Sequence, residues 1–249
     1  MDIYAHRGAA GEAPENTIAG CLHAIDRGTR FLELDIRISA DDQFVVIHDS
    51  NTSRTTGRNK LVKNCTAGQL GKMDAREVGP PWPESKDCHI PTLEAVLEAT
   101  PECERYLLDL KVSSMQKIST TVKLLGDMFP NADSASRVVM VSSSEAFLNG
   151  ITAEIPYLTT GLLGLNINFV WSQEKPAFEH ILLPLPMCTP YHLRKLKNYD
   201  VKISVWPVND PAMIKNLYRM SVDGVITDYP SMALPLVATM QRKKRFKFL

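Results

Sequence analysis

Two carboxylates stand two residues apart in the segment FLELDI (31–36), whose other residues are apolar. In a β-strand Glu33 and Asp35 share one face, because side chains alternate between the two faces. Neighbouring carboxylates repel each other unless a positive charge lies between them, and hard cations such as Mg²⁺ and Ca²⁺ take oxygen ligands. Asp109, in the apolar segment YLLDL (106–110), supplies a third carboxylate. The three acids predict a divalent metal site, with solvent-facing acids or structural ion pairs as the alternative.

Two histidines have the context that acid–base chemistry needs. His6 ends the first apolar segment, and His48 ends a segment that returns towards Asp35. Imidazole titrates near neutrality, so two histidines beside a carboxylate cluster can serve as an acid and a base. Arg7 has forked donors that suit a phosphate. A structural hydrogen-bonding role is the alternative for each histidine.

The other candidate residues carry weaker signals. Trp206 closes the segment VKISVW, where an indole could form the wall of a substrate pocket, although core packing is the more common role for such a residue taken alone. The four remaining histidines have no comparable context and receive no role, namely His23, His89, His180 and His192.

The elements that must position these residues alternate along the chain. Short apolar runs rich in β-branched residues are separated by stretches with helical spacing, such as residues 17–28 and 211–220. Eight such strand–helix units predict a (β/α)8 barrel, with an open doubly wound sheet as the alternative. The predicted strands span residues 3–6, 31–36, 106–110, 138–141, 157–163, 180–184, 201–206 and 224–227.

One segment breaks this alternation. Residues 44–47 follow the second strand too closely for a helical crossover, so residues 31–50 are predicted to form an antiparallel hairpin. Its midpoint near residues 41–42 places Asp35 roughly opposite His48. Residues 50–90 are rich in Thr, Asn, Gly, Lys and Pro, which indicates an insertion within one domain covering residues 1–249. A final helix is expected at about 232–241, followed by the basic tail 242–249.

Composition excludes several classes of protein. Apolar residues make up 44% of the 249 residues and charged residues 22%, which fits a globular barrel of ordinary size. Lys and Arg number 28, equal to Asp and Glu, but five of the basic residues lie in the last eight positions. The rest of the chain is therefore acidic, with a net charge of about −5, and does not suit nucleic acid.

The remaining features of composition concern the compartment. The five cysteines are scattered, without metal-binding spacing or a disulfide framework, which favours a reducing environment. The first residues lack a leader pattern, and the uncharged stretch 155–173 is broken by Pro156 and polar residues, so it makes a poor membrane span. We expect a soluble, cytoplasmic protein, with weak membrane contact through the basic tail as an alternative to a solvated end.

Taken together, several segments of the chain resemble the glycerophosphodiester phosphodiesterase family. The similarity runs from the first predicted strand to the last and includes the specific pairing of His-Arg-Gly…Pro-Glu-Asn-Thr with Glu-x-Asp…His-Asp. The matching segments are HRGAAGEAPENT (6–17), ELDIRISADDQFVVIHD (33–49), RTTG (54–57), DLK (109–111), VWPVND (205–210) and VDGVITDYP (222–230). The resemblance implies a barrel that hydrolyses glycerophosphodiesters to glycerol 3-phosphate and an alcohol.

The resemblance also implies roles for residues at matching positions. It makes His6 and His48 the catalytic acid–base pair, and it assigns a divalent ion to Glu33, Asp35 and Asp109. It places Arg7 and Lys111 on the phosphate and Trp206 on the glycerol side, while Glu15 and Asn16 would order the first loop. Three departures from the family pattern stand out: Asp109 replaces a Glu, Pro207 replaces a Thr, and the segment 142–144 lacks an aromatic residue.

Several questions stay open at the level of sequence. The nucleophile could be water or the substrate's own 2-hydroxyl, and either histidine could be the acid. A lysophospholipase D-like activity on single-chain lipids shares the same headgroup chemistry. A non-catalytic binder of phosphorylated ligands is a third hypothesis, although it would have no need of an acid–base pair. The oligomeric state, the alcohol headgroup and the choice between Mg²⁺ and Ca²⁺ are likewise undetermined.

Overall fold

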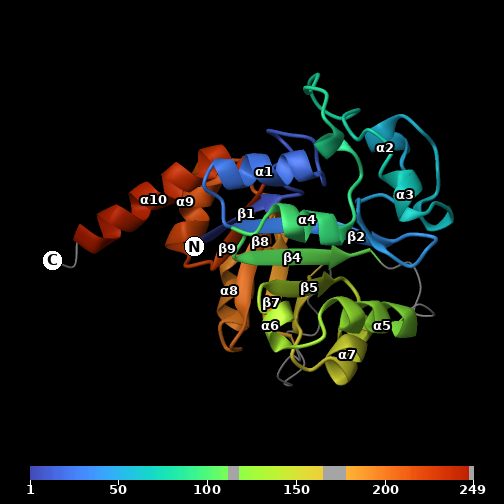
Figure 1. Cartoon of the computed structure of the whole chain (residues 1–249). Coiled ribbons are helices and arrows are strands. Elements are labelled where there is room, and N and C mark those ends of the chain that lie inside the picture. Colours follow the sequence, from blue (N-terminus) through green and yellow to red (C-terminus); the bar gives the residue numbers. More distant parts are fainter. Residues whose placement is uncertain (112–117, 165–177, 247–249) are drawn as a thin grey trace.

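The computed structural model describes residues 1–111, 118–164 and 178–246, and only the backbone of residues 243–246. Eight parallel strands close into a barrel, because β1 pairs with both β2 and β9 (Figure 1). The predicted (β/α)8 barrel and its eight strands are confirmed. These strands are β1 (Asp2–His6), β2 (Phe31–Ile38), β4 (Arg105–Leu110), β5 (Val138–Ser142), β6 (Thr159–Leu163), β7 (His180–Pro184), β8 (Lys202–Trp206) and β9 (Gly224–Thr227).

Helices cover the outside of the barrel (Figure 1). Several begin at a side chain that accepts a hydrogen bond from the first helical turn, as Thr17 does for α1 and Asp210 does for α9. The helices outside the insertion are α1 (Ile18–Asp26), α4 (Leu93–Ala99), α5 (Ile118–Met128), α6 (Ala132–Ala135), α7 (Glu145–Glu154), η5 (Leu185–Met187), α8 (Pro190–Leu196), α9 (Pro211–Arg219) and α10 (Pro230–Phe246).

The strand period of two divides the side chains between two layers. One set packs inside the barrel and forms a buried cluster of Tyr4, Leu107, Val139, Val141, Leu163, Leu182 and Ile226. The alternate set packs outward against the helices in two larger clusters. Counting by twos from Tyr4 and Leu107 reaches His6 and Asp109 at the carboxyl ends of their strands. The barrel interior is therefore filled mainly with apolar side chains, whereas polar side chains lie at its mouth, where the strands end.

The predicted hairpin is present as β2 and β3 (Phe44–Val46), which pair antiparallel outside the closed barrel. The register differs slightly from expectation. Ile36 is opposite Val46, and the amide of Ile47 donates to the carbonyl of Asp35 at 2.9 Å. His48 therefore lies one residue beyond the position opposite Asp35, just after the hairpin's return strand.

The insertion packs onto the hairpin through its own apolar cluster. Its short helices are α2 (Ser53–Thr56), η1 (Val62–Asn64), α3 (Ala67–Leu70) and η2 (Lys86–Cys88). A capping box between Thr66 and Gln69 begins α3, where the sequence shows only a weak helical pattern. The cluster beneath joins β3 to the insertion through Val45, Ile47, Val62, Cys65, Ala67, Leu70, Met73, Ala75 and Ile90. The insertion thus stands beside the barrel mouth as an extension of the hairpin.

The last helix is longer than the sequence pattern predicts. Instead of ending near residue 241, α10 continues through Phe246 and includes most of the basic tail. Residues 247–249 of the tail lie outside the described residues, as does the part of the uncharged stretch from residue 165 onward. Among the described helices, none has the length and apolar character needed to cross a bilayer.

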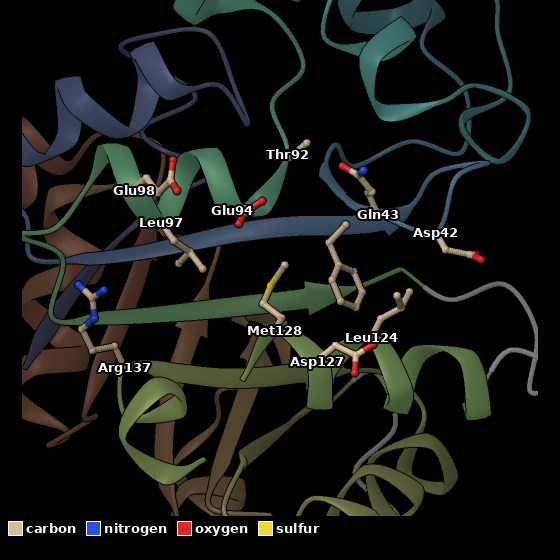
Figure 2. Close-up of a pocket in the computed structure, with 11 residues that line it drawn as sticks. Asp42, Gln43, Thr92, Glu94, Leu97, Glu98, Leu124, Asp127, Met128 and Arg137 are labelled. Carbon is tan, nitrogen blue, oxygen red and sulfur yellow. The ribbon is translucent and has the colours of Figure 1, made fainter. Parts of the chain in front are cut away.

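A cleft of about 600 Å³ opens on the outer surface between α4 and α5 (Figure 2). Leu97, Leu124 and Met128 contribute apolar surface, and carboxylates such as Glu94 and Asp127 also line it. The cleft belongs to the helical layer and includes none of the residues predicted to do chemistry.

Candidate active site

The three predicted metal ligands come together at the mouth. Glu33, Asp35 and Asp109 are all buried, and each offers a carboxylate oxygen within 4.8 Å of the others. The parallel register explains this meeting, since Asp35 is directly beside Asp109 in the β2–β4 pairing. The acids thus form one compact cluster, as predicted from their types and strand positions.

The protein's own cations do not fully balance this cluster. Burial and the neighbouring charge of Asp35 raise the pKa of Glu33 to about 7. Burial also raises the pKa of Asp109, outweighing the effect of its ion pair with Lys111. For Asp35, burial alone would raise the pKa, but the charges of Lys111 and Arg7 outweigh it and lower the pKa. An oxygen-only cluster with excess buried negative charge fits a divalent cation.

Two cations stand beside the acids. The Nζ of Lys111 lies 3.0 Å from Asp35 Oδ1 and 2.5 Å from Asp109 Oδ2. The Nε of Arg7 lies 3.2 Å from Asp35 Oδ2, and its Nη1 donates to Glu15 at 3.0 Å. Both positive groups are thus held at the rim of the acid cluster, where an anionic ligand would meet them.

The first loop is built tightly around these contacts. Arg7 has a φ of 52° and Gly8 one of 74°, left-handed values that cost a non-glycine residue of order 1–3 kcal/mol. The strained turn directs the Arg7 amide to Glu33 Oε2 at 3.1 Å. Asn16 closes the loop with two hydrogen bonds. Its side-chain Nδ2 donates to Asp35 Oδ2 at 2.9 Å, and its backbone N–H donates to the Arg7 carbonyl at 2.7 Å. Glu15 and Asn16 thus hold Arg7 and Asp35 in place through this loop.

His6 is anchored by Asp228, a residue for which the sequence predicts no role. Its Nδ1 lies 2.5 Å from Asp228 Oδ1, and its Nε2 lies 3.9 Å from Glu33 Oε2. Burial alone would lower the pKa of His6, but the bond to Asp228 and the charge of Glu33 outweigh it and raise the pKa. Asn209 fixes Asp228 in turn by donating its Nδ2 to Oδ2 at 2.5 Å.

His48 has a parallel arrangement. Its Nδ1 lies 2.7 Å from Asp49 Oδ1, the carboxylate of the next residue. Burial alone would raise the pKa of Asp49, but hydrogen bonds from His48 and Arg54 outweigh it and lower the pKa. The His48 carbonyl accepts from Arg37 Nε at 2.8 Å, which fixes the backbone at the end of the hairpin. Each histidine thus has an aspartate on Nδ1.

Trp206 ends β8 and packs against the cluster inside the barrel. Its Nε1 is buried and has no hydrogen-bond acceptor among the residues that the structure describes. Two contacts lie at the positions where the sequence departs from the family pattern. Two residues after Pro207, Asn209 donates to Asp228, and Ser144 begins α7 by accepting a bond from the Phe147 amide.

The geometry permits proton transfer by two histidines next to a cation-binding, anion-attracting cluster. Together with the barrel mouth, these features fit one class of protein, a hydrolase of phosphate esters that works with a divalent cation.

Comparison with known proteins identifies the family. Residues 6–232 match the model of the glycerophosphoryl diester phosphodiesterase family. The Bacillus subtilis protein YhdW is 32% identical over 92% of this chain and 95% of its own length. A mouse protein named lysophospholipase D is 30% identical over 91% of this chain and 82% of its own. An Oleispira antarctica phosphodiesterase, solved with its product sn-glycerol-3-phosphate, has a TM-score of 0.81 at 23% identity, covering 96% and 97% of the two chains.

The chain belongs to the glycerophosphoryl diester phosphodiesterase family. It is an enzyme that hydrolyses glycerophosphodiesters, as the resemblance in its sequence implies.

Proposed function

We propose that His6 and His48 are the acid–base pair with which the chain hydrolyses glycerophosphodiesters to glycerol 3-phosphate and an alcohol. The observation that carries this proposal is the matched anchoring of the two imidazoles. Asp228 and Asp49 each take up Nδ1, and neither Nε2 has a hydrogen-bond partner among the described residues. An aspartate on Nδ1 fixes the ring and leaves Nε2 to exchange a proton with the substrate.

Charge explains the surrounding residues. A phosphodiester anion resists attack by an electron-rich oxygen, so the site must first neutralise it. Arg7 and Lys111 are the cations in position to hold the phosphoryl oxygens, and both are kept in place by buried carboxylates. Glu33, Asp35 and Asp109 would hold a divalent cation, which would add positive charge against the same oxygens.

The proton transfers follow from this arrangement. One histidine takes the proton of the nucleophile, either water or the substrate's 2-hydroxyl, as the nucleophile's oxygen bonds to phosphorus and the phosphorus–oxygen bond to the alcohol breaks. Attack by the 2-hydroxyl gives a cyclic phosphate, which water then opens to glycerol 3-phosphate. The other histidine gives its proton to the departing alkoxide oxygen, so that charge does not accumulate on it. Trp206 lies at the same mouth, and its buried Nε1 would donate to an oxygen on the glycerol side of the substrate.

The cation we propose is Mg²⁺ or Ca²⁺. All three ligands are carboxylates, the donors that these hard ions prefer over nitrogen or sulfur. The five cysteines are free thiols and contribute no ligand to this cluster. Scattered cysteines without a disulfide framework are typical of a reducing compartment, so we propose a cytoplasmic location. We also propose that the chain forms a single domain that includes the insertion.

A second candidate activity has a specific observation in its favour. The similarity to mouse lysophospholipase D extends over most of this chain, and a lysophospholipid has the same phosphodiester headgroup. The two substrate classes differ in the acyl chain, which needs apolar surface beside the mouth. Parallel assays with glycerophosphocholine and lysophosphatidylcholine would separate them.

Turnover of glycerophosphocholine tests the main proposal. We expect release of glycerol 3-phosphate and choline in the presence of Mg²⁺ or Ca²⁺, and no release after treatment with a chelator. If the protein binds glycerophosphocholine in calorimetry but releases no product with either ion, it is a binder and the proposed reaction is wrong.

A further inference from the structure

The insertion brings one cation to the edge of the mouth. Arg54, in the short helix α2, has a side chain that is 37% exposed and makes three hydrogen bonds with carboxylates. Its Nε donates to Asp49 Oδ2 at 2.6 Å. Its Nη1 and Nη2 donate to the two carboxylate oxygens of Glu15, each at 2.7 Å. A bond to each oxygen of Glu15 is the strong, forked form of an arginine–carboxylate pair.

The two carboxylates that Arg54 joins each hold a different part of the site. Asp49 uses its other oxygen to hold His48 Nδ1 at 2.7 Å. Glu15 accepts from Arg7 Nη1 at 3.0 Å. Arg54 therefore connects the anchor of one histidine to the anchor of the phosphate-binding arginine, through residues 39 and 5 positions away in sequence.

The charges agree with this geometry. Glu15 is only 8% exposed, and burial alone would raise its pKa. Hydrogen bonds from Arg54 and the charge of Arg7 outweigh burial and lower the pKa, so Glu15 stays ionised. Without Arg54, a buried carboxylate would retain only Arg7 as a partner, and Arg7 would be drawn away from the phosphate position.

We infer that Arg54 is a positioning residue for the hydrolysis, through which the insertion holds His48 and Arg7 in their working positions. This inference rests on the proposed function, since it assigns roles to the same two residues. Arg54 acts here through Asp49 and Glu15, which take three of the five N–H donors of its guanidinium.

Removing the guanidinium tests the inference. Arg54→Ala should lower kcat/KM for glycerophosphocholine by about 10- to 100-fold, the range seen when a partner of a site residue is lost. Arg54→Lys should recover little of this loss, because one ammonium cannot reproduce three donors in a fixed plane. Added guanidinium ion should raise the kcat/KM of Arg54→Ala at least about threefold and leave that of wild type unchanged. A general loss of stability would not show this response.

A matched variant separates position from charge. Arg58 lies in the same insertion and is exposed, and its side chain forms no ion pair with the described residues. Arg58→Ala removes the same charge and should keep wild-type kcat/KM. In a double-mutant cycle, Arg54→Ala should cost less when Glu15 is already Gln, since part of the effect of Arg54 passes through its contact with Glu15 and the rest through Asp49.

The possible outcomes are distinct. A wild-type protein that hydrolyses no glycerophosphodiester with either metal would refute the proposed function itself. Active wild type with equally active Arg54→Ala would overturn the inference alone, as would an equal loss in Arg58→Ala. If thermal unfolding shows that Arg54→Ala is not folded, Arg54→Lys decides the matter, because wild-type activity in that variant would also overturn the inference.

Discussion

Asp228 holds the Nδ1 atom of His6 at 2.5 Å, although 222 residues separate them in sequence. The contact joins the first strand of the barrel to the loop after the last, where β1 and β9 pair side by side. Asn209 donates to the second oxygen of Asp228, so the carboxylate has a donor on each side. The closure of the barrel is therefore what completes the environment of His6.

This relationship predicts the effect of Asp228→Asn. The new amide has an NH2 group in place of one oxygen, so either the position facing His6 or the position facing Asn209 changes from an acceptor to a donor. We expect kcat for glycerophosphocholine to fall by about 10- to 100-fold. Asp210→Asn is the matched control, because an Asn still begins α9 and should leave kcat near the wild-type value. Equal activity in Asp228→Asn and Asp210→Asn would show that Asp228 does not orient His6.

The sequence contains a signal for Asp228 that strand periodicity could have revealed. Residue 226 faces the barrel interior, so residue 228 shares that side at the carboxyl end of β9, as His6 does on β1. The same alternation correctly predicts where Glu33 and Asp109 lie. Positions on regular strands are predictable because the period of two fixes the face and the barrel fixes the end.

Arg54 could not be predicted in this way. It belongs to an insertion of short helices, where no sustained period fixes the direction of a side chain. Its contacts depend on how the apolar cluster under the insertion packs against β3, which is a tertiary property. The small error in the register of the hairpin has a similar origin, since the turn at residues 39–43 sets which residue is opposite Asp35.

The two histidines should each be essential to turnover. His6→Ala and His48→Ala should lower kcat by about 10²–10⁴, the range for losing a general acid or base, with thermal unfolding near that of wild type. His89→Ala offers a control within the insertion, where Nδ1 of the imidazole is hydrogen-bonded to the Gly71 carbonyl at 3.0 Å. Near-normal turnover in either test variant would make that histidine structural and exclude the proposed pair.

The third proposed metal ligand, Asp109, can be tested by substitution. Its side chain is one methylene shorter than the Glu found in the family, which retracts the carboxylate by about 1.5 Å. Asp109→Ala should raise the metal concentration for half-maximal hydrolysis at least about tenfold, or roughly 1.4 kcal/mol. Asp109→Glu should be tolerated and should change the ratio of the activity with Mg²⁺ to the activity with Ca²⁺.

The measurement is a titration of hydrolysis rate with each ion after removal of bound metal. Thr120→Ala, in α5 on the outside of the barrel, provides a folded control that should titrate like wild type. If Asp109→Ala also titrates like wild type, Asp109 is not a ligand and only Glu33 and Asp35 remain.

His180, at the start of β7, leads to a prediction about the stability of the protein in acid. His180 begins β7, is 4% exposed, and has a buried Nδ1 without a hydrogen-bond partner in the described structure. Burial and the charge of Lys202 lower the pKa of His180 from 6.5 to about 4. The unfolded chain therefore binds a proton at a higher pH than the folded chain does.

The sign of the effect follows from this difference. Stability due to neutral His180 is fully present above pH 6.5 and is lost as the pH falls from 6.5 towards 4, by about 2–3 kcal/mol at pH 4.5. His180→Leu removes the group, so its free energy of unfolding should fall less than that of wild type between pH 7.5 and 4.5. Leu182→Ala, on the same interior face, should lower stability by a similar amount at both pH values, because it changes no titrating group. Urea unfolding of the three proteins at the two pH values measures the difference, and parallel losses in wild type and His180→Leu would show that His180 is not the acid-sensitive group.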